Sequence, residues 1–165
     1  KRQGANGLLA LSVPIVKPDT IKCPTKDIRI SDHGEWRHLH WNAIASAYGS
    51  SPFFEYYQDD IRPFFEKRYE FLLDFNEEIR RTVCDLIGLE PHIEYSSSYS
   101  EPAPGETDLR DAIHPKKRKA ETILPVQPKP YYQVFSEKYG FQPDLSIIDL
   151  LMNMGPESIL ILQNA

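Results

Sequence analysis

The stretch WRHLHWNAIASAYGSSPFFEYY, residues 36–57, contains two His, two Trp, three Tyr and two Phe. Aromatic side chains bury large apolar areas, and histidine is the side chain that most readily exchanges a proton near neutral pH. This density indicates either a well-anchored core or the wall of a pocket. The residues alone do not distinguish these two interpretations.

A helix is predicted to begin just before this stretch. Asp32-x-x-Glu35 has the form of a capping box, and the helix should run from there to about Tyr48. Gly49 follows at the position where glycine commonly closes a helix in the left-handed conformation. Ser51-Pro52 then predicts the start of a second helix, which should end before Pro63.

The clearest helical pattern lies downstream. Apolar residues recur at helical spacing over about six turns, which predicts one buried stripe ended by Gly88. These residues are Phe65, Tyr69, Leu72, Phe75, Ile79, Val83 and Leu86. Three further helices are expected near the C-terminus: residues 131–139, the segment after a Ser146-x-x-Asp149 capping box, and residues 157–162.

Three short strands are predicted: a buried one over Leu8–Val16, one over Asp27–Ile30 and one over His92–Tyr95. Residues 96–107 and 115–130 are rich in Ser, Pro and charged residues and are predicted to be loops. The fold class expected is therefore α+β, mainly helical with a small sheet of short strands. At this length, residues 1–165 should form a single domain.

Composition limits the classes of function. A net charge of −5 argues against a general nucleic-acid binder, and no apolar run is long enough for a membrane span. Cys23 and Cys84 show neither metal-ligand spacing nor a disulfide framework, so we expect a cytoplasmic protein without a metal site. Neither GxxxxGK[ST] nor GxGxxG occurs, so no cofactor is predicted. Oligomeric state is left open.

Three separated groups of motifs, in order, resemble the WbqC-like protein family. The N-terminal group is Gly4-Ala5-Asn6-Gly7, Leu11-Ser12-Val13-Pro14, His40-Trp41, Ser46-Ala47-Tyr48-Gly49 and Ser51-Pro52-Phe53-Phe54-Glu55-Tyr56-Tyr57. The middle group is Lys67, Tyr69, Phe71-Leu72 and Asp74-Phe75-Asn76. The C-terminal group is Tyr131-Tyr132-Gln133-Val134-Phe135, Leu145-Ser146-Ile147-Ile148-Asp149-Leu150-Leu151, Asn153 and Gly155-Pro156. The chain looks most like members from Bacteroidetes-type bacteria.

The beginning of the chain is expected to be incomplete. Asn6-Gly7 is a strong hairpin signal, yet only Lys1 to Ala5 precede it to supply the first strand. Members of the resembled family usually begin with a Tyr-Phe-Pro motif, which this sequence lacks. Both observations predict a single WbqC-like domain without its N-terminal segment.

The resemblance implies a role in making surface polysaccharides of the O-antigen type. Some members are proposed to attach an amino-acyl group to a sugar, so one hypothesis is an amino-acyl or acyl transferase acting on a sugar or nucleotide-sugar. The alternative is a non-catalytic module of the same pathway that binds a sugar or a partner enzyme. The family offers no established catalytic residues to transfer, and whether the chain is an enzyme stays open.

Candidate site residues follow from side-chain chemistry. His40 is the candidate general base, with Asp149 as the second catalytic candidate. Alternatively, His40 is a core residue and Asp149 only completes its helix cap. The remaining candidates would bind substrate: Tyr48, Tyr56, Asn153 and Trp41. For the tyrosines, core packing with the hydroxyl at the surface is the favoured alternative. His38 points away from His40 on the same helix and is interpreted as a surface residue.

Overall fold

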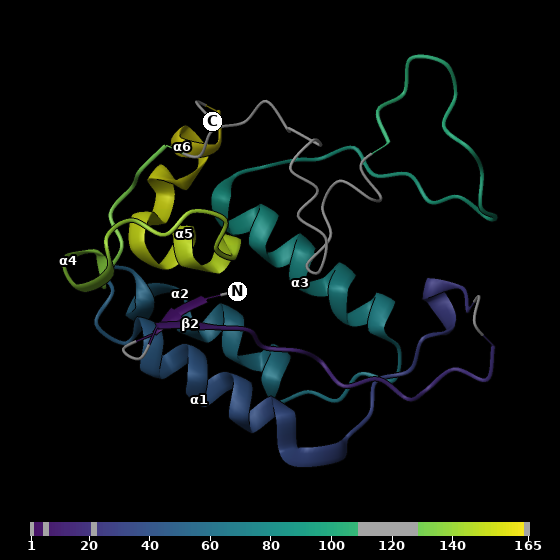
Figure 1. Cartoon of the computed structure of the whole chain (residues 1–165), viewed down its shortest axis with the longest axis horizontal. Helices are drawn as coiled ribbons and strands as arrows, with labels where there is room; N and C mark the ends of the chain where they lie inside the picture. Colours follow the sequence, from purple (N-terminus) through teal and green to yellow (C-terminus); the bar gives the residue numbers. More distant parts are fainter. Residues whose placement is uncertain (1, 5–6, 21–22, 109–128, 164–165) are drawn as a thin grey trace.

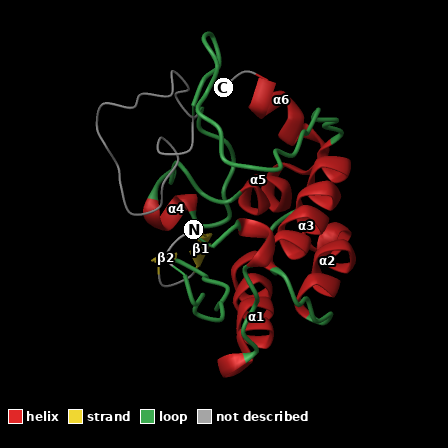
Figure 2. Cartoon of the chain, turned by 90° about the vertical axis from the view of Figure 1, so that its right-hand side faces the viewer, coloured by secondary structure: helices red, strands yellow, loops and turns green. Residues whose placement is uncertain are grey.

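The computed structural model describes residues 2–4, 7–20, 23–108 and 129–163. Its body consists of α1 (Trp36–Tyr48), α2 (Phe54–Ile61), α3 (Leu72–Ile87) and α5 (Ile147–Met154), which surround a common core (Figure 1). Figure 2 shows α2 and α3 on one side of the molecule, with a hairpin and the short α4 (Ser136–Tyr139) on the other. The last helix, α6, covers Ser158–Gln163.

Short elements connect these helices. Four 3-10 turns are formed by η1 (Thr25–Asp27), η2 (His33–Glu35), η3 (Arg62–Phe65) and η4 (Gly155–Glu157), counted over the described ranges. The hairpin pairs β1 (Arg2–Gly4) with β2 (Gly7–Leu9) in antiparallel register.

The fold is mainly helical, as predicted, but among the described residues the strands form only the β1–β2 hairpin, and a sheet of the three predicted strands is not found. Only the first residues of Leu8–Val16 lie in a strand, and Leu8 and Leu9 are exposed rather than buried. Asp27–Ile30 forms isolated bridges, Ile15 with Ile30 and Arg29 with Phe71, instead of a strand. Proline has no backbone N–H, so Pro14 and Pro18 cannot donate hydrogen bonds to the segment that faces them. The isolated bridges therefore do not extend into a longer strand pairing. His92–Tyr95 has no strand structure.

The core has two connected parts. The larger lies among α1, α2, α3 and α5, where Tyr48, Ile61, Leu151 and Met152 are almost fully enclosed. The smaller lies at the beginning of α1 and consists of Ile30, Trp36, Phe64, Tyr69 and Phe75. The aromatic stretch of residues 36–57 therefore contributes to both parts of the core.

Helix ends were predicted better than helix beginnings. α1 ends at Tyr48 and α3 is closed by Gly88 in the left-handed conformation, as predicted. The α3 stripe, however, begins at Leu72 and not at Phe65, because Phe65 belongs to the 3-10 turn η3, which contains Pro63. Gly49 is right-handed, so the predicted left-handed cap there is wrong.

The two predicted capping boxes have different outcomes. The Ser146 hydroxyl accepts from the Ile148 N–H at 3.4 Å, as a cap should, but the Asp149 carboxylate contacts other groups. Asp32 makes no cap bond because Gly34 (φ 76°) and Glu35 (φ 49°) are left-handed and separate η2 from α1. The loop predicted over 96–107 is exposed and contains neither helix nor strand, whereas most of 115–130 lies outside the described residues.

Candidate functional site

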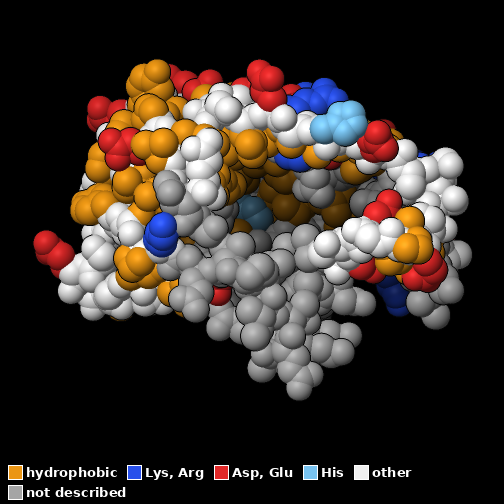
Figure 3. All heavy atoms as spheres, turned by 90° about the horizontal axis from the view of Figure 1, so that it is seen from above, with side chains coloured by type: hydrophobic (Ala, Val, Ile, Leu, Met, Phe, Trp, Pro, Cys, Tyr) orange, Lys and Arg blue, Asp and Glu red, His pale blue; other side chains and the backbone are white. Residues whose placement is uncertain are grey.

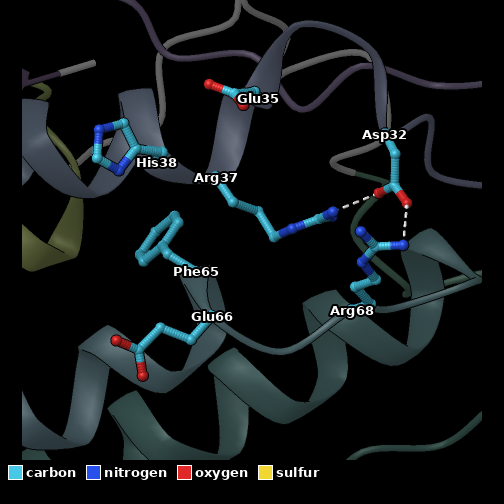
Figure 4. Close-up of a pocket in the computed structure, with 7 residues that line it drawn as sticks. All are labelled: Asp32, Glu35, Arg37, His38, Phe65, Glu66 and Arg68. Atoms are coloured by element: carbon cyan, nitrogen blue, oxygen red, sulfur yellow. Dashed lines mark hydrogen bonds and ion pairs between the residues drawn. The ribbon is translucent and has the colours of Figure 1, made fainter.

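A cleft of about 530 Å³ opens beside the first turn of α1 (Figure 4). One wall comes from the kinked segment that enters α1, and the other from the end of η3 and the residues after it. The lining side chains are Asp32, Glu35, Arg37, His38, Phe65, Glu66 and Arg68. All of them except Phe65 are charged or can hydrogen-bond through a ring nitrogen, so the cleft is a polar site with one aromatic ring.

Backbone geometry places the first wall. Glu35 is one of two described non-glycine residues with positive φ, the other being Asp144. A left-handed glutamate costs roughly 1 kcal/mol or more relative to glycine, and such strain concentrates at functional sites. Because the backbone is kinked at Gly34 and Glu35, this segment does not continue helix α1 toward the N-terminus. The Asp32 and Glu35 side chains therefore lie on the rim of the cleft.

Asp32 contacts two guanidinium groups in the cleft. It forms an ion pair and hydrogen bond with Arg37, and a second ion pair with Arg68 at 3.5 Å (Figure 4). The hydrogen bond from Arg37 is the main reason that the pKa of Asp32 lies below its ordinary value. Asp32 is therefore a carboxylate at neutral pH, and it links the two walls.

The two arginine side chains differ in how firmly their surroundings hold them. The Arg37 side chain is 14% exposed and its guanidinium lies 5.1 Å from the centre of the Trp36 ring, so the group is held in place. Its Nη1 is buried and has no hydrogen-bond partner among the described residues. Arg68 is 81% exposed, so its guanidinium can adapt to a ligand.

His38 lies at the other end of the cleft from Asp32 (Figure 4). Its Nε2 is 2.8 Å from Nδ2 of Asn42, and since an amide nitrogen only donates, Nε2 accepts. The neutral ring then carries its proton on Nδ1. His38 is exposed, as predicted, and its position on the cleft was not predicted.

Three predicted site residues, Tyr48, Asp149 and Asn153, lie close together, but in the interior of the molecule. The Tyr131 hydroxyl donates to Oδ2 of Asp149 at 2.8 Å, and Nε2 of Gln133 donates to the same oxygen at 3.1 Å. Burial raises the pKa of Asp149 above its ordinary value, while hydrogen bonds from Tyr131, Tyr48, Gln133 and Asn153 oppose that shift. We call this group the Asp149 network.

The Asp149 network attaches the segment 131–142 to α5. Gln133 exchanges two hydrogen bonds of 2.9 Å with the backbone of Gln142. Asn153 accepts from the Val134 N–H at 3.1 Å and donates to the Asp149 carbonyl at 2.8 Å. Gln133, Asp149 and Asn153 are each at most 2% exposed. Their bonds go to other parts of the fold, so the geometry indicates a structural role.

His40 lies in a different part of the molecule. It is buried, with its ring 5.1 Å from the Trp36 ring and 6.2 Å from the Phe65 ring. Eight residues of helix, about 12 Å, separate it from Tyr48, which faces Asp149. The structure thus groups Tyr48, Asp149 and Asn153 and leaves His40 in an aromatic cluster.

The last two predicted residues are also apart from the cleft lining. Trp41 is half-buried and stacks on Phe54 with 6.2 Å between ring centres. Tyr56 is 73% exposed and meets Tyr57 edge-to-face. Trp41 is therefore packed into the helical body, whereas Tyr56 is free to contact a partner.

Sequence reasoning missed most of the cleft. Asp32 and Glu35 were interpreted as a capping box, and Phe65 as the first residue of the long helix. Arg37, Glu66 and Arg68 belong to no motif. The one local signal was Gly34 inside the proposed cap, where a residue that readily adopts positive φ permits a kink.

Neither a metal centre nor a membrane span is found in the part of the chain that the structure describes. No three side chains of His, Cys, Asp or Glu gather there as a metal site would require. None of the helices in these ranges is long and apolar enough to cross a bilayer. Cys23 and Cys84 are free thiols.

Comparison with known proteins identifies the family. The model of the WbqC-like protein family matches residues 2–133, which include the whole cleft. The chain belongs to the WbqC-like protein family. It is also 23% identical over 176 aligned positions to the uncharacterized protein Rv1507c of Mycobacterium tuberculosis, covering 93% of this chain and 75% of that protein. No solved structure gives a significant match.

Proposed function

We propose that this WbqC-like chain acts in surface-polysaccharide biosynthesis of the O-antigen type and binds a sugar in the cleft beside α1. The pathway rests on what the family resemblance implies. The observation that carries the binding step is the cleft itself, where carboxylates, guanidinium groups and an imidazole surround the ring of Phe65. The candidate enzyme residues His40 and Asp149 do not meet there, so the proposal begins with binding.

The side-chain chemistry of the cleft fits a polyhydroxylated ligand. Neighbouring sugar hydroxyls both donate and accept, so they match a wall that alternates acceptors (Glu35, Glu66) with donors (Arg37, Arg68). Aromatic rings present a flat apolar face with a negative quadrupole, which suits the C–H face of a pyranose. Among the described residues that line the cleft, Phe65 supplies the one phenyl ring. A volume of about 530 Å³ lies within the usual range for small-ligand sites.

Direct binding tests this proposal. The probes are glucose, galactose and N-acetylglucosamine with their 1-phosphates, and glucuronic and galacturonic acid, titrated by isothermal calorimetry. His38→Ala and Glu66→Gln should each weaken binding about tenfold by removing one hydrogen-bonding group. Both residues are exposed, so folding should be unaffected.

Tyr56→Ala is the matched control, because Tyr56 is exposed and lies outside the cleft lining. Binding should be unchanged in this variant. If Tyr56→Ala weakens binding and His38→Ala does not, the aromatic surface near Tyr56 is the binding site and the cleft is not. If no sugar binds the wild type, the proposal of a sugar site fails.

Amino-acyl or acyl transfer to the bound sugar is a second candidate function. The observation in its favour is a solvent-exposed imidazole, His38, on the cleft, whose Nε2 could take the proton of a sugar hydroxyl or amine once a ligand displaces the Asn42 amide from it. The test is the acyl content of surface polysaccharide, measured by mass spectrometry in a deletion strain of the source bacterium complemented with each variant. Loss of acyl groups with His38→Ala but not with His40→Ala would support His38 as the base. The reverse result would restore His40 as the candidate.

A further inference from the structure

We propose that the sugar bound in this cleft carries a negatively charged group, a phosphate or a carboxylate, and that Arg37 and Arg68 bind it. This inference rests on the proposed function and adds the chemical class of the ligand. It follows from three observations: the charge balance around Asp32, the hydrogen-bond donors left over on the two arginines, and the arrangement of the remaining cleft residues.

The charge balance at this end of the cleft is unusual for the molecule. Elsewhere among the described ion pairs, each arginine has a carboxylate of its own: Arg29 with Glu70, Arg62 with Glu66 and Arg80 with Glu77. Arg37 and Arg68 instead share Asp32. Glu66, which lines the same wall of the cleft as Arg68, is already paired with Arg62. Counted over Asp32, Arg37 and Arg68 one positive charge therefore remains, and the carboxylate of Glu35, which also lines the cleft, forms no ion pair with either arginine among the described residues.

The unused donors point in the same direction. A guanidinium has five N–H groups, and Arg37 directs Nη2 to Asp32 while Nη1 has no acceptor among the described residues. A buried donor without a partner costs free energy, so an acceptor supplied by a ligand is favoured there. Because Trp36 and Asp32 already hold Arg37 in place, little side-chain freedom is lost when the ligand binds.

Arg68 complements this fixed group. Its long ion pair of 3.5 Å and its 81% exposure leave most of its N–H groups available. Two guanidinium groups that converge on one point match the oxygen pairs of a carboxylate or phosphate, which arginine binds in bidentate fashion. Figure 4 shows both side chains reaching toward Asp32 from opposite walls.

The rest of the cleft specifies a small ligand with a single anionic end. Glu35 and Glu66 would repel a second negative charge, so a polyphosphate or a nucleic-acid backbone is disfavoured. Phe65 and His38 lie away from Asp32 and would contact the uncharged part of a sugar (Figure 4). Figure 3 shows the molecule from another side, where hydrophobic side chains lie inside a hollow and charged side chains lie along its upper rim.

The test compares matched ligands in calorimetric titrations at 50 mM and 200 mM salt. Each neutral sugar is compared with its own 1-phosphate and, for glucose and galactose, with its uronic acid, and inorganic phosphate is titrated alone. At least one anionic form should bind about tenfold more tightly than its neutral parent, with a preference that falls as salt is raised. Phosphate preferred over carboxylate would identify a sugar phosphate, and the reverse a uronic acid.

Arg68→Gln should abolish this preference, and because Arg68 is exposed the variant should fold normally. Arg37→Gln should do the same, with circular dichroism to confirm folding. Arg81→Gln is the control, since Arg81 is exposed on α3, lies outside the cleft lining and changes the net charge equally. A preference that survives Arg68→Gln, or is lost in Arg81→Gln as well, would overturn the inference.

The other outcomes separate the inference from the proposed function. Equal affinity for neutral sugars and their anionic forms would overturn the anion site and leave sugar binding intact. Inorganic phosphate that binds as tightly as a sugar phosphate, with no neutral sugar bound, would support the anion site and refute the sugar. Absence of binding by every probe would refute both.

Discussion

The Asp149 network and the cleft beside α1 are built from similar groups, yet they use their hydrogen bonds in opposite ways. In the network, Gln133, Asp149 and Asn153 are enclosed, and their partners belong to other segments of the fold. In the cleft, Arg37 has a donor without an acceptor among the described residues, and Arg68 is largely exposed. Polar groups whose hydrogen bonds are all made within the fold hold it together, whereas donors that the fold leaves without an acceptor favour a ligand that supplies one.

The largest effect on stability is expected from Gln133→Ala. The change removes three hydrogen bonds, so the backbone N–H and C=O of the half-buried Gln142 lose their partners and the buried Asp149 carboxylate loses one of its donors. Stability should fall by about 3 kcal/mol. Urea unfolding followed by circular dichroism measures this, with the exposed Gln163→Ala as a control that should have little effect.

Ligand binding by the folded fraction of Gln133→Ala should be unchanged, because the network does not line the cleft. If this variant loses affinity while it is still folded, the two regions are coupled and the distinction between them fails.

A smaller effect, dependent on pH, is expected from Asp149→Asn. Burial raises the folded-state pKa of Asp149 above its unfolded value, so the native state binds the proton more tightly. The stabilisation from this group is therefore fully present below the unfolded pKa and is lost as pH rises through the folded pKa. Asparagine does not titrate, so this decrease in stability with rising pH should disappear.

The measurement is the free energy of unfolding of both proteins at several pH values between 3 and neutrality. The free energy of unfolding of the wild type, relative to that of Asp149→Asn, should decrease as pH rises. Subtracting the variant removes the opposite contributions of Glu77 and Glu78, whose pKa values are lowered chiefly by hydrogen bonds from Arg80 and Lys67. A difference that does not vary with pH would mean that Asp149 keeps an ordinary pKa.

Glu35 tests the cleft side of the comparison. Its φ of 49° suits glycine better than alanine, so Glu35→Gly should be about 1 kcal/mol more stable than Glu35→Ala. Both changes remove the carboxylate and should weaken sugar binding equally. Glu90 is the control, since it does not have a positive φ and glycine should bring no advantage over alanine there. Equal stability of the two Glu35 variants would argue against backbone strain at the cleft.

The sequence predicted those features that depend on local chemistry. Gly88 closes α3 and Ser146 caps α5 because both act within one helical turn. The beginning of α3 was misplaced because Phe65 keeps helical spacing while it belongs to a 3-10 turn. Asp32 was misinterpreted because the kink at Gly34 lets its carboxylate reach two arginines rather than a helix N-terminus.

The candidate site was harder to predict because it joins two segments about thirty residues apart. His40 was left open between a general base and a core residue, and the structure buries it in α1 beside two aromatic rings. Asp149 and Asn153 lie one turn apart in α5, and both are buried. Chemistry-bearing residues can be recognised in a sequence, whereas the partners that saturate them depend on tertiary contacts.

The smallest change in stability, and the sharpest test of the comparison, is expected from Asp32→Asn. Asp32 is exposed, so its ion pairs with Arg37 and Arg68 contribute little to folding, and the unfolding midpoint should hardly move. Removing the carboxylate takes away a competitor for both guanidinium groups. Affinity for a sugar phosphate or uronic acid should therefore rise, on the order of threefold to tenfold. The exposed Asp59→Asn, with the same change in net charge, should leave affinity unaltered.

Removal of one partner should thus have opposite consequences in the two regions. In the Asp149 network it breaks bonds that nothing replaces, while at the cleft it frees donors for a ligand that brings its own acceptors. If Asp32→Asn instead weakens anion binding, Asp32 is needed to orient Arg37 and Arg68, and the cleft is a preorganised network rather than an unsaturated one. Calorimetric titration of the Asp32→Asn variant at two salt concentrations distinguishes these two outcomes. If the change frees the guanidinium groups of Arg37 and Arg68, anion binding should depend more strongly on salt, whereas misplaced guanidinium groups should not increase that dependence.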